Sequence, residues 1–163
     1  MKHTPFALLM IGFVVFSTAF TTTVHAQKLI SSQGKMSVKF PAEYTKTDDG
    51  LTVKYSAVVG EQTFFAAYTI HEVELEDKMG LSEVSLEEFN NILNGTILQK
   101  TEWKVKKNTG LKGVIRMATE EAKVQYHVVM VGQIQYQVVV IAPEATWDQK
   151  ATDKFVKSFK ILK

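Results

Sequence analysis

The stretch from Val124 to Ala142 constrains the fold of this chain more than any other. It consists of two runs rich in β-branched and aromatic residues, joined by Gly132-Gln133. Glycine at the first position of a two-residue loop suits a type II′ turn, whose twist matches that of the flanking strands. The sequence therefore predicts a β-hairpin. The implied pairs are Val131 with Ile134, Val129 with Tyr136, His127 with Val138 and Gln125 with Val140.

Neither face of this predicted hairpin is cleanly polar. A strand with one wet face alternates apolar and polar residues along its length. Here apolar residues stand at both odd and even positions, so the hairpin belongs inside a sheet that is covered on both sides. Gln135 and Gln137 indicate that the cover thins near the turn.

The first 26 residues have the features of a cleaved signal peptide. Lys2 and His3 precede an apolar run from Phe6 to Phe16, and Val24-His25-Ala26 has the small-x-small form of a cleavage site. The run is short for a membrane span. We expect cleavage between Ala26 and Gln27, with an uncleaved anchor as the alternative, and hence a periplasmic or secreted protein without stable membrane insertion.

Cleavage of 26 residues from 163 leaves 137, which suits a single domain. Residues 27–34 form a short polar lead and residues 35–163 the domain. Removing the one lysine of the signal peptide leaves 18 basic against 17 acidic residues, and this balance argues against a nucleic-acid partner. The chain has no cysteine, which excludes thiol catalysis and cysteine–metal sites.

Further strands are expected on both sides of a first helix. A strand at 36–40 is followed by a second hairpin, 51–59 with 62–70, around Gly60-Glu61. Ser85 and Glu88 form an apparent capping box, so the first helix begins at Ser85 and stops at Asn94-Gly95. The remaining expected segments are a strand at 97–105, a loop at 107–113, a strand at 114–119, a turn at 120–122 and a last helix from Trp147 to Leu162.

Short connections between successive strands make the sheet mainly antiparallel. The two-sided hairpin needs cover on each face. We therefore expect an α+β fold in which helices cover both faces of the sheet, as a three-layer α/β/α sandwich.

The chain resembles the Mog1p/PsbP-like superfamily of small α/β/α sandwich proteins. The resemblance rests on Gly34-x-x-x-Val38-x-Phe40-Pro41, Leu111-x-Gly113, Tyr136-x-Val138-Val139-Val140-x-Ala142-Pro143 and Phe155-x-x-Ser158-Phe159-Lys160-Ile161, and covers about residues 34–162. It implies an antiparallel sheet between helices. Plant members assist photosystem II and the Mog1 branch binds a small GTPase, but neither branch's functional residues can be placed on this chain, and a shared fold does not fix chemistry.

His71 and His127 are the two histidines of the predicted domain. No H-x-H or H-E-x-x-H spacing joins them, and no G-x-S-x-G elbow is present. The favoured interpretation of His127 is a core or sheet-edge histidine. Both remain candidates for a binding site, and no catalytic, cofactor or metal residue is assigned.

Charges concentrate in an acidic region, residues 72–88, and a basic region, residues 100–116. The acidic region lacks the EF-hand spacing of a calcium site. The two regions either form a binding surface or pair with each other. Trp103 lies on a lysine-flanked strand and is a candidate anchor for a partner; packing against the first helix is the favoured alternative.

The sequence thus indicates a non-enzymatic binding or accessory protein of the bacterial envelope, without a cofactor and with an unknown protein or small-molecule partner. The alternative is an enzyme or metal-binding protein with an unrecognised His/carboxylate site, built from His71 or His127 and an acidic residue of the 72–88 region. A purely structural envelope component is a third possibility.

Overall fold

The protein was analysed as a computed structural model that describes residues 25–118 and 121–163. Residues 1–24 of the predicted signal peptide lie outside the described residues, as do positions 119 and 120, where a strand end and a turn are expected. The elements are β1 (Gln27–Ser31), β2 (Met36–Phe40), β3 (Thr45–Asp48), β4 (Thr52–Val59), β5 (Gln62–Ile70), α1 (Lys78–Ile92), β6 (Gly95–Val105), β7 (Asn108–Met117), β8 (Ala122–Val131), β9 (Ile134–Pro143), a 3-10 turn (Glu144–Thr146), α2 (Gln149–Ser158) and β10 (Lys160–Ile161).

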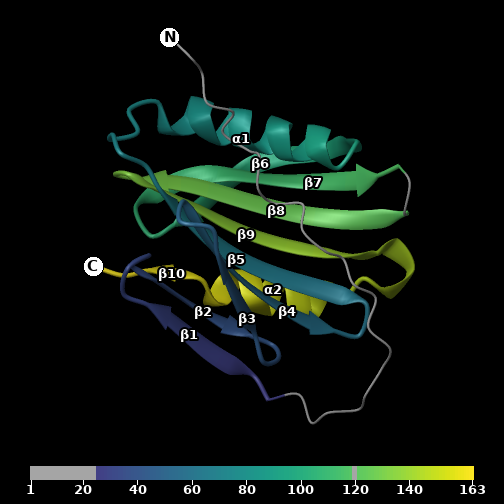
Figure 1. The fold of residues 1–163 in the computed structure, drawn as a ribbon. Helices are drawn as coiled ribbons and strands as arrows, with labels where there is room; N and C mark the ends of the chain where they lie inside the picture. The colour runs from purple at the N-terminus through teal and green to yellow at the C-terminus, as the bar shows by residue number, and fades with distance from the viewer. Residues whose placement is uncertain (1–24, 119–120) are drawn as a thin grey trace.

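Seven strands form the main sheet, in the order β3-β4-β5-β9-β8-β7-β6, and a small second sheet has the order β1-β2-β10 (Figure 1). Every neighbouring pair in both sheets is antiparallel. The α+β class and the mainly antiparallel sheet are therefore confirmed. The β8–β9 hairpin occupies the middle of the main sheet, where both of its edges are paired.

The registers of both hairpins agree with the sequence-based expectation. Val131 pairs with Ile134 and His127 with Val138 in β8–β9. In β4–β5, Ala57 pairs with Phe64 as expected. Glycine opens each turn with a φ of 59°, a left-handed value that an L side chain rarely adopts.

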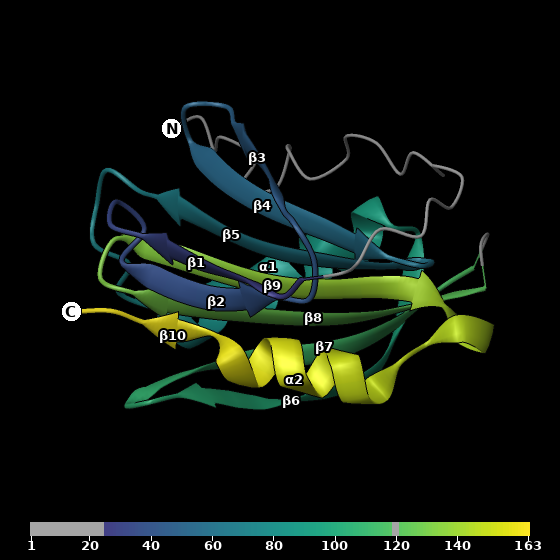
Figure 2. The same ribbon diagram turned by 90° about the horizontal axis from the view of Figure 1, so that it is seen from below.

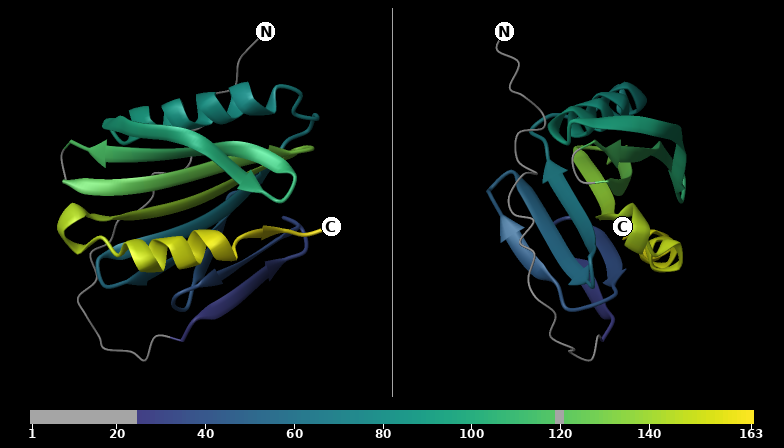
Figure 3. Two further views of the ribbon diagram at one scale, coloured as in Figure 1. Left: turned by 180° about the vertical axis from the view of Figure 1, so that it is seen from behind. Right: turned by 90° about the vertical axis from the view of Figure 1, so that its right-hand side faces the viewer.

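The two faces of the main sheet are covered differently (Figures 2 and 3). Helix α1 packs Leu86 and Phe89 against residues of β7, β8 and β9 on the first face. On the second face, Phe155 and Val156 of α2 share one core with the small sheet. The expected cover by a helix alone is therefore incomplete there. Since α2 has only ten residues, apolar side chains of β1, β2 and β10 cover the rest of that core: Leu29, Met36, Val38, Phe40 and Ile161.

Helix α1 begins at Lys78, seven residues before the expected start at Ser85. Its N-cap is Asp77, whose carboxylate accepts a hydrogen bond from the N–H of Gly80 at 3.0 Å. Ser85 is buried in the middle of the helix and does not cap it. The expected end is close to the observed C-cap, Leu93.

Strand β7 begins at Asn108, so the expected loop at 107–113 is wrong. The chain reverses at Lys106, which has a φ of 55°, and β6 and β7 then pair along almost their whole length. Helix α2 is shorter than expected, because residues after Ser158 leave the helix and form β10 beside β2. Residues 27–31, expected as a polar lead, form β1.

Gly110 lies close to the backbone of β8. A Cβ atom at this position would contact the carbonyl oxygen of Val128 and would lie 2.8 Å from the Cα of Val129. We expect Gly110→Ala to lower the free energy of unfolding by about 1–3 kcal/mol, because two backbones must separate. Urea unfolding measures this value. Thr101→Ala, an exposed change on the neighbouring strand β6, should stay within about 0.5 kcal/mol, and an equal effect of both variants would contradict the close-approach argument.

Candidate functional site

Polar side chains gather on both faces of the main sheet, and the two clusters differ in how far they are enclosed. On the first face they lie beneath α1. On the second face they lie beside α2, over strands β8, β7 and β6, where two hollows open. We call these hollows the Trp103 groove and the Arg116 pocket.

Beneath α1, Ser85 and Tyr126 form the centre of a buried hydrogen-bond network. Their hydroxyl oxygens lie 2.7 Å apart. Gln135 Nε2 donates to the Ser85 hydroxyl at 2.9 Å, and Gln137 Nε2 donates to the Tyr126 hydroxyl at 2.8 Å. Burial raises the pKa of Tyr126 far above its usual value. The sequence predicts thinner cover at these glutamines. Gln137 is half-buried, but Gln135 is buried, and both amides bond to groups supplied by α1 and β8.

His71 also belongs to the first face. Burial lowers the pKa of His71. A hydrogen bond between its side chain and Gln135 has a smaller effect that raises this pKa. Its backbone N–H donates to the carbonyl oxygen of Gln133 at 2.8 Å. Through Gln135, His71 adjoins the network centred on Ser85.

His127 lies on the second face and is 2% exposed. Its Nε2 is 2.9 Å from Gln125 Nε2; when the amide donates, the neutral ring carries its proton on Nδ1. Nδ1 has no hydrogen-bond partner among the described residues. Burial, with the charge of Lys112 as a smaller cause, lowers the pKa of His127 to about 3. The interpretation as a core histidine agrees with this burial.

His71 and His127 are therefore separated by the sheet itself. This separation excludes a site that contains both rings; it does not test the alternative of a site built from His71 or His127 and an acidic residue of the 72–88 region. Within residues 25–118 and 121–163, no group of three or more His, Cys, Asp or Glu side chains is arranged to hold a metal ion.

Trp103 and His127, by contrast, are in direct contact. Their rings meet edge to face, with centroids 4.9 Å apart, and the indole also lies 5.6 Å from the ring of Phe159. The residue opposite Trp103 on β7 is Gly110, which has no side chain, so the indole can lie across β7 and reach β8. The favoured alternative, packing against the first helix, is wrong, because α1 covers the other face.

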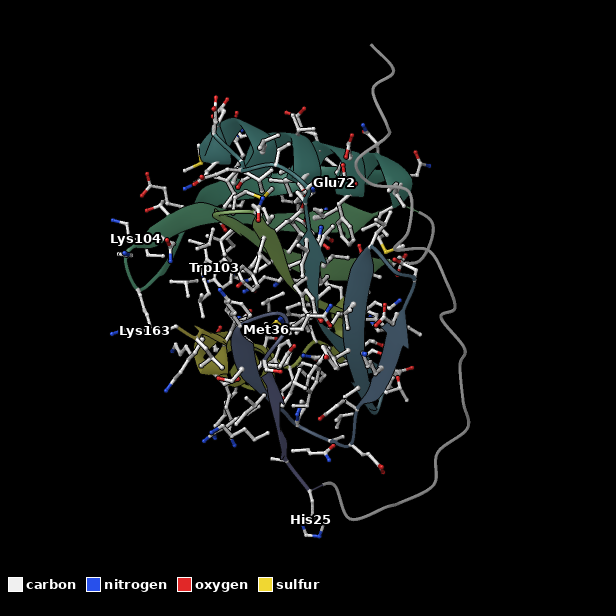
Figure 4. The ribbon with its side chains drawn as sticks, turned by 60° about the vertical axis from the view of Figure 1, so that its left-hand side comes forward. His25, Met36, Glu72, Trp103, Lys104 and Lys163 are labelled. Carbon is white, nitrogen blue, oxygen red and sulfur yellow. The ribbon has the colours of Figure 1, made fainter. Side chains whose placement is uncertain are left out.

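The Trp103 groove lies between the end of β6 and the segment that follows α2. It has a volume of about 220 Å³. Lys106 closes one side, with its Nζ donating to the carbonyl oxygen of Ile161 at 2.8 Å. Four lysines and no acidic residue are found among its described lining residues: Trp103, Lys104, Val105, Lys106, Val156, Lys157, Phe159 and Lys160. Figure 4 shows Trp103 and Lys104 on the side of the molecule where the chain ends at Lys163.

The acidic and basic regions meet at one place. Glu83 of α1 and Lys100 of β6 form an exposed ion pair of 3.1 Å. An exposed pair of this kind contributes only about 0–1 kcal/mol. The lysines of the Trp103 groove lie apart from this pair, near α2 and β10.

Comparison with solved structures identifies the fold. The solution structure of cyanobacterial PsbP (CyanoP) from Synechocystis sp. PCC 6803 is similar with a TM-score of 0.64 and 11% identity, covering 89% of this chain and 97% of the other. The chain thus has a PsbP-like fold. A crystal structure from Bacteroides thetaiotaomicron VPI-5482 has a TM-score of 0.46 and 12% identity over 83% of this chain and 48% of the other. No family model and no curated protein matches the sequence significantly.

No helix within the described part of the chain has the length and hydropathy needed to cross a membrane.

The low pKa of His127 predicts a pH-dependent stability. The folded-state pKa, about 3, lies below the unfolded value of 6.5. The stabilising contribution of the neutral ring to the free energy of unfolding is therefore fully present above pH 6.5 and is lost as the pH falls toward 3. This one group should give a slope of about 1.4 kcal/mol per pH unit in the free energy of unfolding below pH 6. In urea unfolding between pH 6 and 5, the free energy of unfolding should depend less steeply on pH in His127→Gln than in wild type. NMR titration of the wild-type ring tests the same point directly, and protonation near pH 6.5 would contradict it.

Proposed function

We propose that this protein is an exported, non-enzymatic accessory protein of the bacterial envelope that binds an acidic segment of a protein partner in the Trp103 groove. The observation that carries this proposal is the composition of the groove. An aromatic anchor and apolar walls are surrounded by four lysines. No acidic residue is among the described lining residues, although Glu102 lies 3.8 Å from Lys104.

The charge of the groove selects the kind of partner. Surface patches of one sign attract oppositely charged partners and raise the rate of encounter. Tryptophan is enriched among residues that dominate binding energy. A segment that combines carboxylates with an apolar side chain matches both properties of this groove.

The size of the groove favours a protein over a small molecule. Small-molecule sites usually enclose about 300–1,000 Å³. The volume of about 220 Å³ is smaller, and suits one or two side chains of a larger partner. A partner segment would continue over the exposed lysines of α2 and β10.

The proposed location rests on the sequence and on the start of the fold. The first 26 residues have the pattern of a signal peptide. Strand β1 begins at Gln27, the residue that cleavage would make the N-terminus, and pairs with β2 from that residue onward. Cleavage after Ala26 would therefore leave every described strand intact.

Peptide binding tests the groove. We expect a peptide of alternating glutamate and phenylalanine to bind residues 27–163, and Trp103→Ala to weaken this binding about tenfold or more because the anchor is lost. Lys157→Gln together with Lys160→Gln should also weaken binding and make it less sensitive to salt. Isothermal titration calorimetry at two salt concentrations measures both effects.

The matched control is Lys28→Gln together with Lys78→Gln, which removes the same charge at exposed positions on β1 and α1. This variant should bind the peptide as wild type does. Equal losses in both double variants would indicate non-specific attraction and overturn the proposal, as would an absence of peptide binding to wild type.

Export is tested by the mature N-terminus. Expression of residues 1–163 in a Gram-negative host should yield a periplasmic protein that begins at Gln27, because signal peptidase cuts after small residues at the last and third-last positions. Cell fractionation and mass spectrometry measure this. Ala26→Arg should leave the precursor uncut; cytoplasmic protein that retains residues 1–26 would contradict the prediction.

A further inference from the structure

The Arg116 pocket contains two cations that face each other directly. Arg116 of β7 and Lys123 of β8 are cross-strand partners. Directly opposed side chains on an antiparallel pair have Cβ atoms about 4.5–5.5 Å apart, and like charges in this position are destabilising. Both residues line one pocket on the second face of the main sheet, at the opposite end of β6 from Trp103.

Each cation contacts one neighbouring side chain, and together these neighbours do not cancel the two positive charges. Lys123 Nζ lies 4.7 Å from the ring centroid of Trp147. Arg116 Nη2 lies 3.6 Å from Glu144 Oε1, beyond the 2.7–2.9 Å typical of a charge-assisted hydrogen bond. Side-chain exposures of 55% and 56% leave this loose ion pair open to competition from another anion.

The pocket is large enough for a small molecule, and part of its lining is apolar. Its volume is about 500 Å³, within the range of small-molecule sites. The register of β6 and β7 shifts between Ile97 and Gln99, and Leu98 at this irregularity is 50% exposed. Leu98 and Val114 line the pocket together with Gln99. A short hydrocarbon chain can contact these apolar residues while its charged end lies between the cations.

A hydrogen bond fixes the backbone of Glu144 beside the pocket. Its N–H donates to the carbonyl oxygen of Glu121 at 3.0 Å, which ties the start of the segment before α2 to the start of β8. Only the side chain of Glu144 must therefore turn away from Arg116 when another anion binds.

From this geometry we propose that the Arg116 pocket binds a small organic anion. Its phosphate or carboxylate group lies between Arg116 and Lys123 in place of the Glu144 carboxylate, and its short apolar chain lies on Leu98 and Val114. This site is separate from the Trp103 groove and does not depend on the function proposed for that groove.

Inorganic phosphate, butyl phosphate and butyrate serve as probes for NMR and calorimetric titration of residues 27–163. Butyl phosphate should bind more tightly than inorganic phosphate by about fivefold, because part of its chain leaves water. Leu98→Ala should remove this advantage and leave the affinity for inorganic phosphate unchanged. Comparison of butyl phosphate with butyrate shows which anionic group the pocket prefers.

Charge variants test the position of the anion. Arg116→Gln should weaken binding of butyl phosphate about tenfold because a bidentate donor is lost. Glu144→Gln should strengthen binding, since the competing carboxylate is removed. Lys154→Gln, an exposed change on α2 with the same loss of charge as Arg116→Gln, should have no effect, and Trp103→Ala should leave the binding of butyl phosphate unchanged.

The proposal is overturned if none of the three probes shows saturable binding to wild type. It is also overturned if Lys154→Gln weakens binding as much as Arg116→Gln, or if Glu144→Gln weakens it. Arg116 and Glu144 are exposed, so thermal unfolding should confirm that these variants remain folded. Loss of peptide binding in Trp103→Ala with intact butyl phosphate binding would separate the two sites experimentally.

Discussion

The β8–β9 hairpin requires cover on both of its faces, and the rest of the structure depends on this requirement. Val124, Tyr126 and Val128 point to the first face, whereas Val129, Val138 and Val140 point to the second, and all are at most 1% exposed. No single helix can meet both needs. Helix α1 covers one face, and α2 together with the small sheet covers the other, so the chain must return to the hairpin from both its N-terminal and C-terminal segments.

Local signals were sufficient where neighbouring residues decide the structure. A glycine-first loop between two β-branched runs fixed both hairpin registers, because turn length sets which residues face each other. The start of α1 was missed for the opposite reason. Ser85 and Glu88 have the spacing of a capping box, but the Ser85 hydroxyl bonds to Tyr126, 41 residues away in sequence.

The beginning of β7 was missed because its glycines look like loop residues. Gly113 is instead required by packing, since a Cβ there would enter the space of the Leu86 side chain of α1. Gly110 leaves room for the backbone of β8, which a Cβ atom would enter. Both requirements come from elements distant in sequence, so a single sequence does not reveal them.

The same glycine explains why the contact between Trp103 and His127 was not expected. The two residues are on strands that are not neighbours, with β7 between them. Gly110, the residue of β7 opposite Trp103, has no side chain of its own to separate the two rings. The sequence did identify both aromatic residues as candidates, but their proximity depends on a gap that becomes visible only when β6, β7 and β8 are aligned.

The two faces of the sheet carry different polar groups. Beneath α1, the side chains of Ser85, Tyr126, Gln135 and Gln137 bond to one another. Such a network favours one packing of the helix on the sheet. Beside α2, exposed cations have only loose ion pairs: Lys104 of the Trp103 groove lies 3.8 Å from Glu102, and Arg116, opposite Lys123, lies 3.6 Å from Glu144. An added anion lowers the electrostatic free energy of such surface cations, and this is the physical basis of both proposed sites.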